Sequence, residues 1–318
     1  MKSVVEDIKK GSFKPVYLFY GEEAYLKQQY KNRLKNAVLP EGDTINLSIY
    51  GGKGIDVKEM IAQADTMPFF AEHRLLLIED SGFFKNANQQ LAEYIPSIPE
   101  ETIMLFVESE VDKRGKLYKA VSKKGSVVEF TAQNEQTLTR WILGILKTEG
   151  KMITSGAMKQ FLEKTGTDME RIRQELEKLI CYCMEKESIT EEDVAVICSE
   201  QTENKIFDMI NAMAEKKQKK AMELYYDLLA LKEPPMRILY LITRQFNLLM
   251  QVKELSEEGY SAKTISERLK MAGFIVRNCL RQAEYFSLKT LKEALQDCVR
   301  MEEAVKTGRM NDVMSVEL

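Results

Sequence analysis

The residues that come closest to a catalytic motif in this 318-residue chain begin at Gly21, after the apolar run 15–20. A phosphate-binding loop has the pattern Gly-x-x-x-x-Gly-Lys-Ser/Thr, because its backbone N–H groups surround a phosphate and its hydroxyl holds a magnesium ion. Gly21 and Lys27 stand at the first glycine and the lysine of this pattern. Leu26 and Gln28 replace the second glycine and the hydroxyl residue, so half of the pattern is missing.

Acidic residues near this turn argue further against nucleotide binding. Glu22 and Glu23 would place two carboxylates at the N-terminus of the following helix, where they stabilise the helix but repel a triphosphate. Glu79 and Asp80 follow the apolar run 75–78, as metal-binding carboxylates do at the end of a strand. Without a phosphate loop there is no bound nucleotide whose metal ion they would hold. We therefore expect no ATP binding at this turn.

Other catalytic and metal-binding patterns are equally incomplete. His73 is the only histidine, and a lone histidine beside a strand is more often structural than catalytic. Cys181 and Cys183 are two residues apart on an expected helix, so their side chains point to different faces. The chain contains neither a Cys-x-x-Cys pair for zinc nor a Gly-x-Ser-x-Gly nucleophile turn. We expect no catalytic residue, cofactor or metal, and the sequence indicates a binding protein.

A different kind of site is indicated by Met67, Pro68, Phe69 and Phe70, which we call the docking tip. Two adjacent aromatic residues cannot both face one core from a regular strand, and Pro68 discourages a helix from continuing through them. The docking tip follows a helical pattern and precedes a strand-like run, which is compatible with a protruding apolar loop. The alternative is that both rings fill a corner of the core.

Composition limits the class of protein. A chain of 318 residues is too long for one ordinary core, so two or three domains are expected. With 44% hydrophobic and 30% charged residues it is typical of a globular protein, and its net charge of −3 gives it no electrostatic reason to bind nucleic acid alone. The lysine clusters at 123–124 and 216–220 are explained by solvated helix faces.

The sequence also indicates the cellular compartment in which we expect the protein. No apolar run approaches the ~20 residues needed to cross a bilayer, and residues 1–10 have no apolar signal region. Five cysteines, an odd number scattered over a long chain, argue against a disulfide framework. We expect a cytoplasmic protein without a membrane partner.

The first 131 residues alternate short apolar runs with helical patterns, which predicts an α/β fold with a mostly parallel five-stranded sheet and helices on both faces. Strands are expected at 15–20, 45–50, 74–78, 102–107 and 126–130, and helices at 22–35, 57–65, 88–95 and 116–122.

Beyond Thr131 no further strand is expected, and two all-α domains are predicted. Thr190 is the expected N-cap of a helix, with Asp193 three residues later in a capping box. The domain boundaries that we predict are 1–131, 132–203 and 204–318. The last segment carries several apolar stripes at helical spacing, which fit either a self-contained core or a bundle that packs against other chains.

Taken together, these motifs resemble the delta subunit family of bacterial DNA polymerase III clamp loaders over essentially the full length. None is diagnostic alone, but their order and spacing over ~300 residues make the resemblance specific. The motifs that carry the resemblance are the segments 15–23, 67–75, 112–117, 166–169 with 175–179, 189–194, 207–210, Arg244 with Gln245, and 306–308.

The resemblance implies an AAA+-like α/β domain without ATP hydrolysis, a small helical lid-like domain and a helical collar. It also implies a non-catalytic subunit of the polymerase III holoenzyme that binds the sliding clamp (the beta subunit) through Met67, Pro68, Phe69 and Phe70 and opens the ring. The implied partners are delta-prime and gamma/tau type subunits, with primed DNA inside the assembled complex.

Two alternatives from other classes stay open at this point. One is a working ATP-hydrolysing AAA+ motor subunit of a DNA-replication complex, against which the residues after Gly21 speak. The other is a free-standing DNA-binding protein, which the charge of −3 disfavours. Arg237, Arg244 and Lys253 are candidates for the lining of a DNA chamber, or else for solvated faces and subunit contacts.

Overall fold

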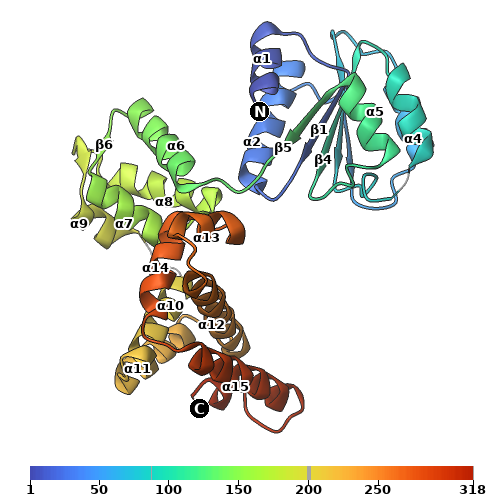
Figure 1. Cartoon of the computed structure of the whole chain (residues 1–318). Coiled ribbons are helices and arrows are strands. Elements are labelled where there is room, and N and C mark those ends of the chain that lie inside the picture. The colour runs from blue at the N-terminus through green and yellow to red at the C-terminus, as the bar shows by residue number, and fades with distance from the viewer. Residues whose placement is uncertain (87, 199–201, 318) are drawn as a thin grey trace. The chain divides into compact units, whose positions relative to one another are not determined.

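The computed structural model describes residues 1–86, 88–198 and 202–317. By its internal contacts the chain divides into two compact units, Met1–Ala132 and Gln133–Leu318 (Figure 1). Each unit is described by itself. The three-domain division at 131 and 203 stays a prediction.

The first unit is built on a five-stranded, all-parallel sheet with the strand order β2-β3-β4-β1-β5. The α/β class and the parallel sheet expected from the sequence are confirmed. The strands are β1 (Val16–Tyr20), β2 (Leu47–Gly51), β3 (Arg74–Glu79), β4 (Thr102–Glu108) and β5 (Ser126–Glu129). The helices are α1 (Lys2–Lys10), α2 (Ala24–Val38), α3 (Val57–Ala64), α4 (Gln89–Tyr94), the 3-10 helix η1 (Ile95–Ser97) and α5 (Lys116–Lys124).

The sheet is covered on both faces, and its central strands β1 and β4 are apolar except at the two ends of β4, Thr102 and Glu108. β1 and β4 are buried along their whole length. Alternate strand residues, among them Leu18, Ile78 and Phe106, form one core with α3, α4, η1 and α5. Figure 1 shows α1 and α2 on the opposite side of the sheet from α4 and α5. Continuous apolar runs of this kind are typical of parallel strands that are buried on both sides.

The second unit is almost entirely helical. Its helices are α6 (Glu135–Thr148), α7 (Ser155–Thr165), α8 (Met169–Tyr182), α9 (Glu191–Ile197), α10 (Thr202–Ala214), α11 (Gln218–Ala230), α12 (Pro235–Glu257), α13 (Ala262–Leu269), α14 (Gly273–Ala283), α15 (Leu288–Lys306) and α16 (Met314–Glu317). None of the helices in the described ranges is long and apolar enough to cross a membrane.

One expectation about this unit is wrong. Two short strands occur beyond Thr131, where none was expected: β6 (Met152–Ile153) pairs in parallel with β7 (Ser188–Ile189). A two-residue strand is too short to show the alternation from which strands are predicted. Each strand runs directly into a helix N-cap, Thr154 or Thr190, so the pair holds the starts of α7 and α9 side by side.

The predicted capping box at the start of α9 is confirmed. Asp193 Oδ2 accepts hydrogen bonds from the Thr190 N–H at 2.9 Å and the Thr190 hydroxyl at 2.8 Å. The other carboxylate oxygen of Asp193 pairs with Lys186 Nζ at 2.5 Å. Hydrogen bonds from Lys186 and Thr190 lower the pKa of the Asp193 carboxyl to about 2.

A buried polar side chain fixes three helices of the C-terminal bundle against one another. Gln282 on α14 donates from Nε2 to the Phe207 carbonyl oxygen at 2.9 Å and to Asn211 Oδ1 at 2.8 Å, both on α10. Its own Oε1 accepts from Gln245 Nε2 on α12 at 2.8 Å. Since every bond requires one relative placement of the helices, this network makes the packing specific.

Candidate functional site

The turn at Gly21, where a phosphate loop would lie, is filled by the chain itself. The segment after β5 crosses it, so that Phe130 donates its N–H to the Tyr20 carbonyl oxygen at 2.7 Å and accepts from the Glu23 N–H at 3.1 Å. Gly21 has φ 117°, and a Cβ atom there would overlap the Phe130 carbonyl oxygen. Glycine therefore stands at this position because another backbone passes next to it, and the Glu23 amide is not aimed at a ligand.

The lysines behind this turn are likewise bound within the protein. Lys27, at the lysine position of the phosphate-loop pattern, donates to the Glu108 carbonyl oxygen at 3.2 Å. Burial lowers the pKa of its ammonium group. Lys31 is buried on the next turn of α2 and pairs with Glu79 Oε1 at 2.7 Å. Glu79 is thereby used in an ion pair at the end of β3, where a metal-binding carboxylate would be needed.

The carboxyl edge of the sheet is completed by a buried acid. The carboxylate of Glu108 accepts hydrogen bonds from the Ser81 N–H at 3.1 Å, the Ser81 hydroxyl and the Gly82 N–H at 3.3 Å. Burial raises the pKa of Glu108 in spite of these bonds. In an open α/β sheet a nucleotide binds at the carboxyl ends of the strands. Here the acids, backbone amides and lysines at that edge are hydrogen-bonded or ion-paired to one another.

The remaining candidates for chemistry are dispersed. The ring of His73 packs edge-on against Phe13 with 5.7 Å between centroids. Cys181 near the end of α8 is exposed and Cys183, the C-cap residue of that helix, is buried, so the two side chains point to different sides. Within the described residues no three His, Cys, Asp or Glu side chains gather as metal ligands would.

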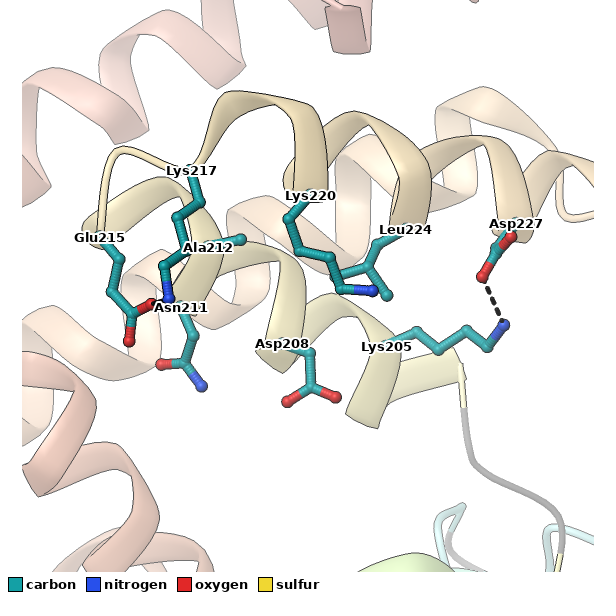
Figure 2. A pocket seen from close by; sticks show the side chains of 9 residues that line it. All are labelled: Lys205, Asp208, Asn211, Ala212, Glu215, Lys217, Lys220, Leu224 and Asp227. Carbon is teal, nitrogen blue, oxygen red and sulfur yellow. Dashed lines mark hydrogen bonds and ion pairs between the residues drawn. The ribbon is translucent and has the colours of Figure 1, made fainter.

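A pocket of about 390 Å³ lies between α10 and α11 (Figure 2). Figure 2 shows lysines and carboxylates alternating around it, with Lys205 Nζ 3.5 Å from Asp227 Oδ2. Lys217 at its rim pairs with Glu215 at 2.6 Å. Because the lining holds three lysines and three carboxylates, the pocket has no net charge with which to select an anion or a cation.

The docking tip lies in the loop between α3 and β3, and its large side chains face solvent. Met67 is 74% exposed, Phe69 56% and Phe70 94%, whereas Pro68 is half-buried. The two rings meet edge to face with 4.6 Å between centroids. The alternative, in which both rings fill a corner of the core, is therefore wrong. Phe70 has φ 50°, a left-handed conformation that is unusual for a bulky residue.

The ends of this loop are fixed to the sheet. Thr102 at the start of β4 donates its hydroxyl to the Ala64 carbonyl oxygen at the end of α3, at 2.7 Å. Tyr94 donates its hydroxyl to Asp65 at 2.6 Å. On the other side Arg74, the first residue of β3 and 4% exposed, directs Nη2 toward the Met67 carbonyl oxygen at 3.4 Å. The exposed rings thus stand on a short loop with a rigid base.

Sequence reasoning missed the residue that contacts the docking tip most directly, Asn46. The side chain of Asn46 is buried and hydrogen-bonds to the backbone of Phe69. Its neighbour Ile45 is 63% exposed. The run 45–50 was predicted to be a strand because it alternates apolar and polar residues, so Asn46 gave no signal of a separate role.

Comparison with known proteins gives a consistent result. A family model described as the delta subunit of DNA polymerase III matches residues 17–131, and a model of the C-terminal domain of that subunit matches residues 203–318. The DNA polymerase III subunit delta of Bacillus subtilis (strain 168) is 31% identical over 99% of this chain and 94% of its own length. The probable DNA polymerase III subunit delta of Aquifex aeolicus is 21% identical over 77% of this chain and 72% of its own.

A solved structure agrees with these sequence matches. The DNA clamp loader delta protein of Bacillus subtilis superposes with a TM-score of 0.68 at 30% identity, over 99% of this chain and 97% of that protein. The similarity covers both compact units of the chain.

Proposed function

The chain belongs to the delta subunit family of DNA polymerase III, and on that basis we propose that it binds the ring-shaped sliding clamp through the docking tip and opens the ring. The observation that carries the proposal is the exposure of Phe69 and Phe70 on a loop with a fixed base. Large apolar side chains that face solvent next to each other are typical of a site for another protein.

The energy available from the two rings is considerable but not sufficient alone. Each phenylalanine can bury ~150–250 Å² in a pocket on a partner. At ~25 cal/mol per Å² the pair contributes roughly 8–12 kcal/mol, against association and ordering costs of ~4–15 kcal/mol. Flanking residues must therefore add to the interface, and the exposed side chains of Met67 and Ile45 are suited to do so.

Ring opening requires only a difference in affinity. A protein that binds the open or relaxed shape of a clamp protomer better than the closed shape shifts the ring toward opening. In our proposal the two phenylalanines anchor the complex, and α3, which leads directly into the docking tip, supplies the leverage. No nucleotide chemistry in this chain is needed for that step.

We further propose that the protein works without hydrolysing ATP. The closed turn at Gly21 and the bound Lys27 disfavour the alternative of an ATP-hydrolysing motor subunit. The assembly would include delta-prime and gamma/tau type subunits and primed DNA, within the replication machinery of the cytoplasm.

Two of the basic candidates in the C-terminal bundle, Lys253 and Arg237, are engaged by other groups of this chain. Lys253 donates to the Ala283 carbonyl oxygen at 3.2 Å, and Arg237 pairs with Glu233 at 3.4 Å. We assign no DNA contact to these side chains or to Arg244.

The proposal is tested by measuring the affinity of the full chain for the sliding clamp of the same organism. Phe69→Ala and Phe70→Ala should each weaken binding by ~2 kcal/mol or more, about 30-fold, as expected for a central aromatic anchor. Met184→Ala is the matched control, because Met184 is 76% exposed but lies in the second unit. The proposal fails if both phenylalanine variants bind within ~0.5 kcal/mol of the wild type.

A further inference from the structure

We propose that Asn46 is a positioning residue that holds the docking tip in the conformation in which it binds. The inference rests on the proposed function, since it assigns Asn46 a role in clamp binding without direct contact between its side chain and the clamp. It is carried by the hydrogen bonds of one buried amide.

The Asn46 side chain forms hydrogen bonds with both the N–H and the carbonyl oxygen of Phe69. Asn46 Oδ1 accepts from the Phe69 N–H at 2.7 Å, and Asn46 Nδ2 donates to the Phe69 carbonyl oxygen at 3.0 Å. An amide is the side chain that can do both at once, because it carries a donor and an acceptor next to each other. Phe69 is thereby paired like a residue in a strand, although it lies in a loop.

Asn46 is itself held rigidly. It is 2% exposed, directly precedes β2, and its carbonyl oxygen accepts from the Leu75 N–H of β3 at 2.9 Å. Asp43 accepts the second Nδ2 hydrogen at 2.7 Å and the Asn46 N–H at 3.0 Å. These partners also fix the orientation of the amide, because a flipped group would set Nδ2 against the Phe69 N–H. The sheet, Asp43 and Asn46 form one continuous support for Phe69.

The position of Phe70 follows from this support. With the Phe69 backbone fixed on both sides, the left-handed turn at Phe70 directs its ring into solvent and sets it edge-on to the Phe69 ring. A loop that is already ordered in its binding conformation avoids the ordering cost on association. Loss of the Asn46 bonds should therefore weaken clamp binding even though the two phenylalanines are still present.

The test uses two variants of the full chain. Asn46→Ala removes both bonds to Phe69 and the side-chain bond to Asp43. Asn46→Asp keeps the shape of the side chain but sets an oxygen against the Phe69 carbonyl oxygen and against the Asp43 carboxylate. We expect both to bind the clamp about 5- to 30-fold more weakly, which is the cost of ordering roughly one backbone residue. Asn134→Ala is the matched control, because it removes another asparagine side chain, which accepts from the Thr137 N–H at 2.9 Å at the start of α6 in the second unit.

Amide hydrogen exchange of the free protein separates positioning from a general loss of stability. In both Asn46 variants exchange should become faster at residues 67–70, while β1 and β4 stay protected as in the wild type. If exchange rises equally throughout the sheet and clamp affinity is unchanged, Asn46 is only a structural residue and the inference is wrong.

The two proposals fail in different ways. Normal clamp binding by the Phe69→Ala and Phe70→Ala variants would refute the proposed function. Loss of binding in these variants, together with wild-type affinity and wild-type exchange at residues 67–70 in the Asn46 variants, would refute only the role of Asn46.

Discussion

Lys27 donates a hydrogen bond from Nζ to the carbonyl oxygen of Glu108, 3.2 Å away. The lysine that matches the phosphate-loop pattern is thus engaged by the end of β4. The neighbouring Glu23 amide is engaged in the same way by Phe130. Groups that would bind phosphate in a related motor protein here stabilise the contact between α2 and the sheet.

Restoring the two missing residues of the phosphate-loop pattern should not restore nucleotide binding. We expect the double variant Leu26→Gly, Gln28→Thr to show no saturable binding of a fluorescent ATP analogue with magnesium, because Phe130 still occupies the turn and Glu22 and Glu23 still repel phosphate. Fluorescence titration measures this, with an ATP-hydrolysing AAA+ subunit as the positive control. A dissociation constant in the micromolar range would show that the closed turn opens easily.

Gly21→Ala should destabilise the first unit strongly. At φ 117° the new Cβ would be strained and would also meet the Phe130 backbone, so we expect a loss of ~3 kcal/mol or more in the free energy of unfolding. Gly52→Ala is the control, because Gly52 has φ 76° with open space around it and should lose only ~1–2 kcal/mol. The single tryptophan, Trp141, lies in the second unit, so hydrogen exchange of β1 is the suitable measurement. Equal losses in the two variants would show that the contact with Phe130 can relax.

Phe70→Gly should raise the stability of the free chain but weaken its binding to the clamp. Glycine adopts φ 50° without strain and Phe70 buries almost no surface in the free chain, so the free energy of unfolding should rise by ~0.5–1 kcal/mol. Clamp affinity should fall at least as far as in Phe70→Ala. Urea unfolding of both variants, compared at the same pH, measures the difference. A destabilised glycine variant would indicate that the ring supports the loop as well as displaying it.

The second unit should lose stability in acid through Asp193. The pKa of Asp193 in the folded chain is about 2, below its ordinary value of 3.8, so its charge stabilises the fold above pH ~4 and this contribution is lost as the pH falls toward 2. The urea midpoint of the wild type should therefore exceed that of Asp193→Asn at pH 6, and the gap should narrow below pH 4. Trp141 fluorescence reports this unit. A difference in urea midpoint between the two proteins that stays the same down to pH 2 would contradict the stabilising role of the Asp193 charge.

Much of the first unit could be predicted from the sequence because its signals are local. The apolar runs at 15–20 and 102–107 are long enough to indicate buried strands, and the alternation of strands with helical patterns indicates a parallel sheet. The adjacency of Phe69 and Phe70 after Pro68 left both an exposed loop and a corner of the core open, and the resemblance to the delta subunit family favoured the exposed loop. The Thr190 cap was visible because its partner Asp193 is only three residues away.

What could not be predicted depends on contacts between distant segments. Asn46 is separated from Phe69 by 23 positions, and nothing near it in the sequence marks a partner. The burial of Lys31 against Glu79, 48 positions away, is hidden for the same reason, since lysines on helices are ordinarily exposed. The closed turn at Gly21 could be inferred only as a missing motif, because the Phe130 backbone that fills it comes from the end of the unit.

The strand order has a consequence for synthesis of the chain on the ribosome. β1 is among the first segments to be made, yet it pairs only with β4 and β5, which are the last strands of its unit. Until residue 108 has emerged, the apolar run Val16–Tyr20 has no strand beside it, and its second edge stays open to incorrect partners until residue 129 has emerged. Such long-range parallel pairing folds slowly and leaves incomplete chains prone to aggregation. A nascent chain that stalls before β5 should therefore need protection by chaperones, whereas one released after it can close its sheet.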